Sequence, residues 1–196
     1  MKYYIDFDNT LFNTEKFYGD LIKIVSDYNI TEEKINDCYQ KYCLNEFFNP
    51  LKIINKLIEK HKFKNDIEKH LEIFLKDISV YLYDDSINFL EYLNSKNYEV
   101  NLLTYGDFDY QKEKIEKSFI KDYFNKIIIT SIEKPNLDLD YKNAIFVDDN
   151  EYQLKGLIKK DAKVIRIRRN GNKHSINDIK NVLEFENFNE YLKSIK

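Results

Sequence analysis

Two aspartates stand two residues apart directly after the first apolar run of the chain. The run YYI is followed by Asp6, Phe7 and Asp8, and Thr10 comes shortly after them. Residues i and i+2 of a strand point to the same side of a sheet, so we expect the two carboxylates to lie side by side. Like charges this close are costly unless a positive group shares them. The sequence therefore predicts a cationic partner for Asp6 and Asp8.

More polar residues stand at the ends of two later apolar runs. Thr104 follows VNLL, and Asp148 and Asp149 follow AIFV. Continuously apolar runs suit parallel strands that are buried on both faces, and the carboxyl ends of such strands form the binding edge of a sheet. Four carboxylates at one edge need a counter-ion. A hard divalent cation suits them, and Mg²⁺ in particular keeps several waters and readily bridges to a phosphate.

A phosphoryl group beside such a cation would also need donors from the protein. Hydroxyl groups, backbone N–H groups and Lys or Arg side chains serve this purpose. Thr104 offers a hydroxyl, and Lys134 follows the strand-like run KIIITS. Lys126 and Lys142 stay open as alternatives for the phosphate-binding lysine.

Strand patterns alternate with helix patterns over most of the chain. This alternation is typical of right-handed βαβ units and predicts an α/β fold with a parallel sheet. We expect strands over 2–6, 98–106, 126–131, 144–150 and 162–168, and helices over 84–97, 109–120, 151–161 and 176–195.

The block from Thr14 to Lys76 differs because its apolar residues recur only at helical spacing. We therefore expect an all-helical insertion over 13–80, with 1–12 and 81–196 forming the α/β core. Several aromatic residues of the insertion are interpreted as core, with a pocket lining as the alternative: Tyr18, Tyr39, Tyr42, Phe47 and Phe48.

Composition limits the classes of partner. The 196 residues carry a net charge of −3, which gives no electrostatic reason to expect a nucleic acid or an anionic membrane as partner. No apolar run has membrane-spanning length, and the first residues do not resemble a signal peptide. Cys38 and Cys43 imply no disulfide framework and are interpreted as buried small residues. We therefore expect a cytoplasmic protein, and the sequence does not predict its oligomeric state.

All three arginines lie in one short segment, VIRIRRNGNKH, as Arg166, Arg168 and Arg169. Together with Lys173 and His174 they suggest an anion-binding or nucleic-acid-binding patch. The preferred interpretation is the solvent-facing side of an edge strand, where charges also prevent pairing with another sheet.

The order of these motifs resembles that of the haloacid dehalogenase-like (HAD) superfamily. DFDNT resembles its motif one, Asp-x-Asp-x-Thr; Thr104 resembles motif two, Lys134 motif three, and the pair Asp148 and Asp149 motif four. The likeness extends over the whole chain, and the helical insertion occupies the place of a C1-type helical cap. The resemblance implies a three-layer, Rossmann-like parallel sheet core with an inserted all-helical cap.

The resemblance also implies roles for the first motif. Asp6 would be the nucleophile that forms an aspartyl-phosphate. Asp8, oriented by Thr10, would protonate the leaving oxygen and later take a proton from water. An acid near neutral pH needs a raised pKa, which we expect the crowded carboxylates to produce in Asp8.

The remaining motifs would hold the metal and the phosphoryl group. Mg²⁺ would be held by Asp6, the Asp8 main-chain carbonyl and Asp148, with Asp149 acting through water or orienting the lysine. The phosphoryl group would be bound by the second and third motifs and their neighbours: Thr104, Tyr105, Gly106 and Lys134.

The second aspartate indicates the reaction. Family members that cleave carbon–halogen bonds lack the equivalent of Asp8, because a departing halide needs no acid. The expected function is therefore a Mg²⁺-dependent phosphatase that hydrolyses a small phosphorylated metabolite. A nucleotidase, a polynucleotide phosphatase and a non-catalytic binding protein of the same superfamily remain as alternatives.

Overall fold

The computed structural model describes residues 1–44, 46–169 and 182–195. Its centre is a six-stranded sheet in the order β3-β2-β1-β4-β5-β6, and every neighbouring pair is parallel. The expected α/β fold is thereby confirmed. The strands are β1 (Lys2–Ile5), β2 (Glu99–Tyr105), β3 (Lys126–Thr130), β4 (Ala144–Asp148), β5 (Lys163–Ile167) and β6 (Val182–Phe185).

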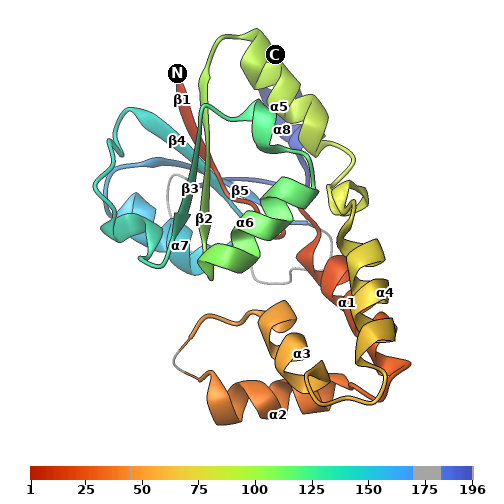
Figure 1. Ribbon diagram of the computed structural model, residues 1–196. Coiled ribbons are helices and arrows are strands. Elements are labelled where there is room, and N and C mark those ends of the chain that lie inside the picture. Colours follow the sequence, from red (N-terminus) through yellow and green to blue (C-terminus); the bar gives the residue numbers. More distant parts are fainter. Residues whose placement is uncertain (45, 170–181, 196) are drawn as a thin grey trace.

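Helices cover both faces of the sheet (Figure 1). On one face lie α5 (Ser86–Ser95), α6 (Phe108–Lys117) and α8 (Phe188–Ser194), and on the other lies α7 (Glu151–Ile158). Successive residues of β1 serve opposite faces, since Ile5 belongs to the larger apolar cluster and Tyr4 to the smaller one. The three-layer, Rossmann-like arrangement expected from the sequence is therefore confirmed.

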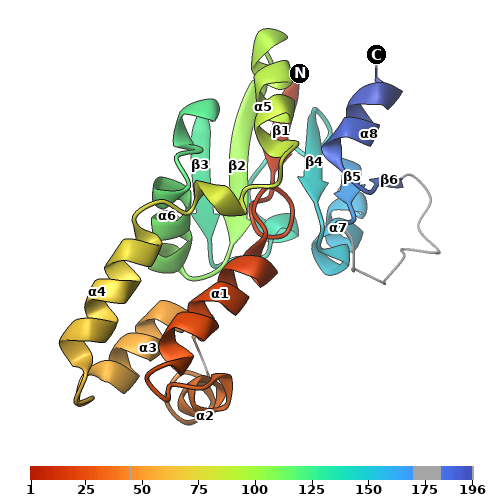
Figure 2. The ribbon, with the colours of Figure 1, turned by 90° about the vertical axis from the view of Figure 1, so that its right-hand side faces the viewer.

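Four further helices follow β1 and lie beyond the carboxyl ends of the strands (Figures 1 and 2). They are α1 (Thr14–Ser26), α2 (Glu32–Tyr42), α3 (Pro50–Ile58) and α4 (Lys64–Leu75). We call α1–α4 the four-helix segment. The side chains of Asn13, Thr31 and Asn49 cap the first three by accepting a backbone N–H, which explains where these helices begin. Cys38 and Cys43 are free and buried, as expected.

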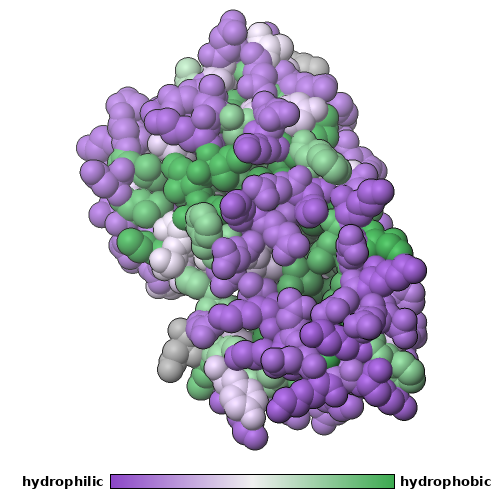
Figure 3. Space-filling model, viewed as in Figure 1, coloured by the Kyte–Doolittle hydropathy of each residue, from purple (hydrophilic) through white to green (hydrophobic). Residues whose placement is uncertain are grey.

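Single helical turns complete the connections as 3₁₀ helices η1 (Ser79–Tyr81), η2 (Lys121–Tyr123) and η3 (Lys134–Asn136). Hydrophilic residues cover most of the four-helix segment, whereas apolar residues gather over the sheet (Figure 3). The edge strand β3 contributes half-buried isoleucines at 127–129. Within the described part of the chain, no helix is both long and apolar enough to cross a membrane.

The C-terminal part of the sheet differs from the expectation. The described residues of 176–195 form β6 and α8 instead of one helical region. Because β6 pairs with β5, the arginine-bearing strand is not an edge strand. A short strand with two half-buried and two exposed positions carries little apolar alternation, so its pairing depends on β5.

The arginines are therefore not a solvated face, and that interpretation was wrong. Arg166 is buried, and its guanidinium lies 3.2 Å from Glu184 on β6, which also pairs with Arg168 at 3.2 Å. Lys173 and His174 lie outside the described residues. Arg166 and Arg168, which we expected to face solvent, therefore form ion pairs that join the end of β5 to β6.

Arg169 connects the end of β5 to the loop after β1. Its Nε and Nη2 donate to the Thr10 carbonyl at 3.1 and 2.8 Å, and its Nη1 donates to Asp85 at 2.8 Å. The guanidinium also lies over the rings of Tyr83 and Phe188. Asp85 occupies the N-cap position of α5, but its carboxylate does not cap the helix and instead accepts from Arg169 and from the Phe188 N–H.

We expect Arg169→Met to destabilise the protein by about 3 kcal/mol, because it leaves the buried Asp85 carboxylate without its partner. Chemical denaturation measures the change. Arg168→Met is the matched control, since it removes a partly exposed pair and should cost less than about 1 kcal/mol. Equal losses in both variants would contradict a special role for the buried pair.

Candidate active site

The loop after β1 presents two carboxylates at the carboxyl edge of the sheet. Asp6 follows the last residue of β1, and the chain then reverses at Asn9, whose φ is 54°. Asn adopts this left-handed conformation more readily than most residues. The N–H groups of Leu11 and Phe12 both donate to the Phe7 carbonyl at 3.0 Å, which closes the reversal. The local sequence therefore folds into a tight loop that carries Asp6 and Asp8.

Lys134 is the cationic partner of Asp6. Its Nζ lies 2.6 Å from Asp6 Oδ1 and 2.6 Å from Asp148 Oδ2, and only 2% of its side chain is exposed. Burial lowers the pKa of Lys134, but the two carboxylates outweigh burial and raise it above its ordinary value. Lys126 starts β3 at the opposite end of the sheet, and Lys142 is exposed. Of the three candidate lysines, Lys134 reaches the carboxylates.

Three contacts hold the backbone around Lys134. Its N–H donates to Gln153 Oε1 at 2.9 Å, and its carbonyl accepts from Tyr141 Oη at 2.9 Å. A Cβ at Gly156 would lie 2.3 Å from Pro135 Cγ, so this glycine lets α7 approach η3 closely. The sequence reasoning missed Gln153 and Gly156, although a glycine inside a helix pattern is a signal of close packing.

The two acids after β4 have different surroundings. Asp148 Oδ2 bonds Lys134, and Asp148 Oδ1 accepts the Asn150 N–H at 2.8 Å. The Asp149 carboxylate accepts no hydrogen bond from any residue that the structure describes, while its carbonyl accepts from Arg166 Nε at 3.2 Å. The sequence favoured Asp148 as the direct metal ligand, with Asp149 acting through water or orienting the lysine. In the structure it is Asp148 that contacts Lys134, so the Asp149 carboxylate has more acceptor positions available for a metal ion.

Carboxylate oxygens of Asp6, Asp148 and Asp149 lie within 4.8 Å of one another. Burial and the neighbouring carboxylates raise the pKa of Asp6 to about 7 and that of Asp149 to about 8, although Lys134 opposes the shift. The Lys134 ammonium alone therefore does not balance the negative charge of the three carboxylates. A hard divalent cation would supply the missing charge, and the all-oxygen donor set fits Mg²⁺.

A cavity of about 160 Å³ adjoins this cluster. It is lined by Asp6, Asp8, Asn9, Tyr105, Lys134, Asp148, Asp149, Asn150 and Gln153. Thr104 and Gly106, two of the expected phosphate-binding residues, are not among its lining residues. The Thr104 hydroxyl is buried without a hydrogen-bond partner in the described structure, and so is the Thr10 hydroxyl. An unpaired buried hydroxyl is costly, which suits Thr104 to a polar group that arrives with a ligand.

Asp8 has its own set of partners. Its Oδ1 accepts from the Thr14 hydroxyl and the Lys114 ammonium, and its Oδ2 accepts from Gln111 Nε2 at 2.6 Å. Burial alone would raise the pKa of Asp8, but Lys114 and the three hydrogen bonds outweigh it and lower the pKa. The expectation of a raised pKa is therefore wrong for this geometry. Asp8 is also held by residues other than Thr10, the residue that the resemblance implied.

Lys114 and Gln111 are two further site residues that the sequence reasoning did not find. Both lie on the buried side of α6 together with Tyr110 and Ile115. A lysine that falls on the apolar stripe of a helix pattern is the signal that could have identified Lys114, because Lys is almost never fully buried without a partner.

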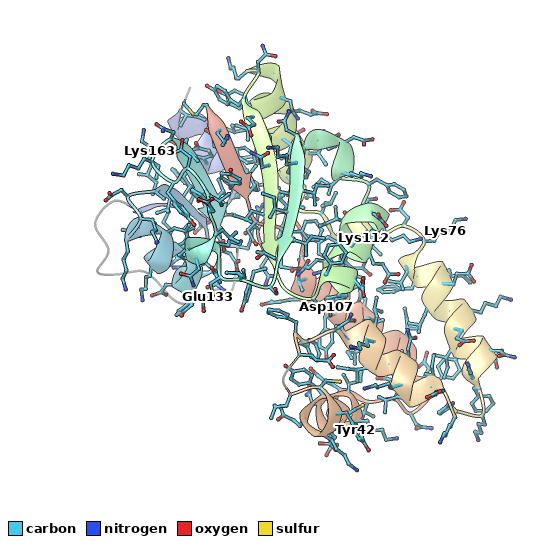
Figure 4. All side chains as sticks on the ribbon, turned by 60° about the vertical axis from the view of Figure 1, so that its left-hand side comes forward. Tyr42, Lys76, Asp107, Lys112, Glu133 and Lys163 are labelled. Atoms are coloured by element: carbon cyan, nitrogen blue, oxygen red, sulfur yellow. The ribbon has the colours of Figure 1, made fainter. Side chains whose placement is uncertain are left out.

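The loop between α2 and α3 makes two contacts with this edge of the sheet. The rings of Phe47 and Tyr105 meet edge to face with centroids 5.0 Å apart, and Asn49 Nδ2 donates to Asp107 Oδ1 at 2.8 Å. Figure 4 shows Asp107 at the end of the sheet that faces the four-helix segment. Among the other aromatic candidates, Tyr18 and Tyr39 pack against Phe48, and Tyr42 is 60% exposed.

These pKa shifts predict how stability depends on pH. Asp6 and Asp149 have a folded-state pKa of about 7 and about 8, above the unfolded value of about 4, so they favour the folded state at low pH. Their contribution is lost as the pH rises through about 8. We expect Mg²⁺ to raise the thermal unfolding midpoint more in alkaline than in acidic buffer.

Thermal melts with Mg²⁺ and with a chelator, over a series of buffers, measure this linkage. Asp149→Asn removes one of the two carboxylates with a raised pKa, so it should weaken both the pH dependence and the Mg²⁺ effect. A Mg²⁺ effect that is the same at every pH would contradict the assignment of these carboxylates to the cation site.

Comparisons with known proteins place this geometry in a family. The model of the haloacid dehalogenase-like hydrolases matches residues 4–167, whereas a search of curated proteins found no match. Among solved structures, a candidate haloacid dehalogenase-like hydrolase from Burkholderia xenovorans LB400 has a TM-score of 0.75 at 16% identity. The alignment covers 97% of this chain and 94% of that one.

Two other solved structures share the fold. A candidate β-phosphoglucomutase from Thermotoga maritima has a TM-score of 0.60 at 16% identity, covering 100% of this chain and 98% of that one. The L-2-haloacid dehalogenase from Xanthobacter autotrophicus has a TM-score of 0.54 at 13% identity, covering 90% and 79%. At these identities the likeness extends to the fold alone. The family match and the sheet with its acidic carboxyl edge agree, and the chain belongs to the haloacid dehalogenase-like hydrolases.

Proposed function

We propose that this hydrolase is a Mg²⁺-dependent phosphatase that acts on a small phosphorylated metabolite through an aspartyl-phosphate. The observation that carries the proposal is the buried Lys134 ammonium, which lies 2.6 Å from both Asp6 and Asp148 beside the cavity. A carboxylate in this position can attack phosphorus without a general base. The same ammonium is placed to balance the charge of a phosphoryl group.

The proposed reaction has two steps. Asp6 attacks phosphorus, the bond from phosphorus to the ester oxygen breaks, and the departing oxygen takes a proton from the protonated form of Asp8, which is a minor form because Lys114 lowers the pKa of this residue. Water then attacks the phosphorus of the aspartyl-phosphate while Asp8 takes its proton, which releases inorganic phosphate and restores the Asp6 carboxylate. Mg²⁺ held by Asp6, Asp149 and the Asp8 carbonyl would supply positive charge beside the transferring group.

Asp8 favours phosphoester hydrolysis over carbon–halogen cleavage. A departing alkoxide needs a proton, whereas a departing halide does not. The Asp8 carboxylate is held in place by three donors and lines the same cavity as Asp6. Such an arrangement has no use in a dehalogenase, although several solved structures of similar fold carry that name.

We also infer that the four-helix segment serves as a C1-type cap. It lies beyond the carboxyl edge of the sheet (Figure 1). Phe47 contacts Tyr105, which lines the cavity. A cap in this place would exclude bulk water and limit the site to small substrates. The boundaries 13–80 for this unit remain part of the proposal.

The rival functions have less support. Arg166 and Arg169, which first suggested nucleic-acid binding, are buried and paired with Glu184 and Asp85. They therefore offer no free positive charge for a polynucleotide. A binding protein without catalysis would have no need for Asp8 beside Asp6. The activity assay below distinguishes such a binding protein from a phosphatase.

Turnover of 4-nitrophenyl phosphate tests the proposal. We expect activity that requires Mg²⁺ and falls by about 10³-fold or more in Asp6→Asn, which removes the nucleophile. Lys134→Ala should lose about 10²- to 10³-fold, as expected when a group that stabilises the transition state is removed. Lys142→Ala is the matched control and should retain the parent rate, since Lys142 is exposed.

The result that would contradict the proposal is equally definite. No Mg²⁺-dependent turnover across aryl, sugar and nucleoside phosphates would favour the non-catalytic reading. Full activity in Asp6→Asn would exclude the aspartyl-phosphate, and equal effects of the two lysine substitutions would exclude Lys134 as the phosphate-binding residue.

A cap role for the four-helix segment predicts an effect of Phe47→Ala. Loss of the ring next to Tyr105 opens the wall of the cavity, so we expect KM for 4-nitrophenyl phosphate to rise several-fold with a smaller change in kcat. Tyr42→Ala removes an exposed ring of the same segment and serves as the control. Identical kinetics for both variants and the parent would argue against the cap.

A further inference from the structure

A buried lysine on α6 takes no part in the steps described above. Lys114 is 1% exposed, and its ammonium bonds Asp8 Oδ1. Gln111 is 4% exposed, lies about one turn earlier on the same helix, and donates to Asp8 Oδ2 at 2.6 Å. One helix of the core therefore holds both oxygens of the Asp8 carboxylate.

The Lys114 ammonium is enclosed by aromatic rings. It lies 4.4 Å from the ring centroid of Tyr110, 5.6 Å from that of Phe7 and 5.8 Å from that of Phe12. The rings come from α6 and from the loop that carries Asp8. A cation over ring faces is stabilised electrostatically, and the rings exclude water around it. The lysine is thus confined to a position where Asp8 is its anionic partner.

Gln111 needs space that a glycine provides. A Cβ at residue 106 would lie 2.8 Å from Gln111 Nε2 and 3.4 Å from its Cγ. Gly106, which the sequence suggested as a phosphate-binding residue, therefore makes room for the side chain that reaches Asp8. The start of α6 is held in turn by Asp107, whose carboxylate accepts the Tyr110 N–H at 2.9 Å.

The hydrogen bonds leave one position open on Asp8. A carboxylate has about four acceptor sites, two on each oxygen. Oδ1 uses two of them for Thr14 and Lys114, and Oδ2 uses one for Gln111. Counting the contacts of the described residues, the remaining site is on Oδ2, so this oxygen can accept one further hydrogen bond.

We propose that Lys114 and Gln111 are positioning residues for proton transfer. They hold Asp8 so that Oδ2 faces the oxygen that leaves phosphorus and, later, the attacking water. The inference rests on the proposed phosphatase function and adds to it the atom that moves the proton and the helix that aims it. Lys114 acts through Asp8 and touches no reacting atom.

The test compares phosphate esters whose leaving groups depend to different degrees on protonation by an acid. Phenolate is a poorer leaving group than 4-nitrophenolate and depends more on an acid. For Lys114→Met and Gln111→Leu we expect kcat/KM to fall about 10- to 100-fold with phenyl phosphate and only about threefold or less with 4-nitrophenyl phosphate. Lys112→Met alters an exposed lysine of the same helix and should leave both values unchanged (Figure 4).

A double-mutant cycle identifies Asp8 as the residue through which Lys114 acts. Asp8→Asn should show the same dependence on the leaving group, and adding Lys114→Met to it should produce little further change. If Lys114→Met does not fold, Gln111→Leu answers the question, because it removes a neutral contact on Oδ2 alone.

The outcomes separate this inference from the proposed function. A parent enzyme that hydrolyses both esters, with variants that lose activity equally on both, would make Lys114 and Gln111 merely structural and overturn the positioning role. A parent enzyme that hydrolyses neither ester in the presence of Mg²⁺ would remove the proposed function, and the inference would fall with it.

Discussion

The crowding of carboxylates at one edge of the sheet is the constraint on which the rest of the site depends. The strand order places β1 beside β4, so Asp6 and Asp148 meet although 142 residues separate them. Lys134 lies between them as a buried counter-charge. A buried ammonium is costly unless it is paired, and Lys134 is paired with both acids. Gly156 lets α7 pack closely against the neighbouring Pro135 ring.

Two buried lysines divide the acids into two groups with different chemistry. Lys134 serves Asp6 and Asp148, while Lys114 serves Asp8. Asp149 has no such partner, and its pKa is raised with that of Asp6. The pKa of Asp8 moves in the opposite direction. Carboxylates within one small site thus contact different cations: the cluster that we propose for Mg²⁺ contacts Lys134, and the residue that we propose for proton transfer contacts Lys114.

The loop after β1 is held from several directions, which suits a segment that must place reacting atoms accurately. Arg169 binds the Thr10 carbonyl from the end of β5, and α6 binds Asp8. The four-helix segment meets this loop through Thr14, whose hydroxyl donates to Asp8. Residues from nearly the whole length of the chain therefore support this loop.

The sequence by itself determined the alternating α/β pattern, the helical block and the acidic motifs, because each is written in local periodicity or spacing. Tertiary structure decided what depends on distant contacts. It selected Lys134 over Lys126 and Lys142, reversed the expected pKa shift of Asp8, and paired β5 with β6. Gln111 and Lys114 are more than a hundred residues from Asp8 along the chain, and only packing of α6 against the first loop brings them to it.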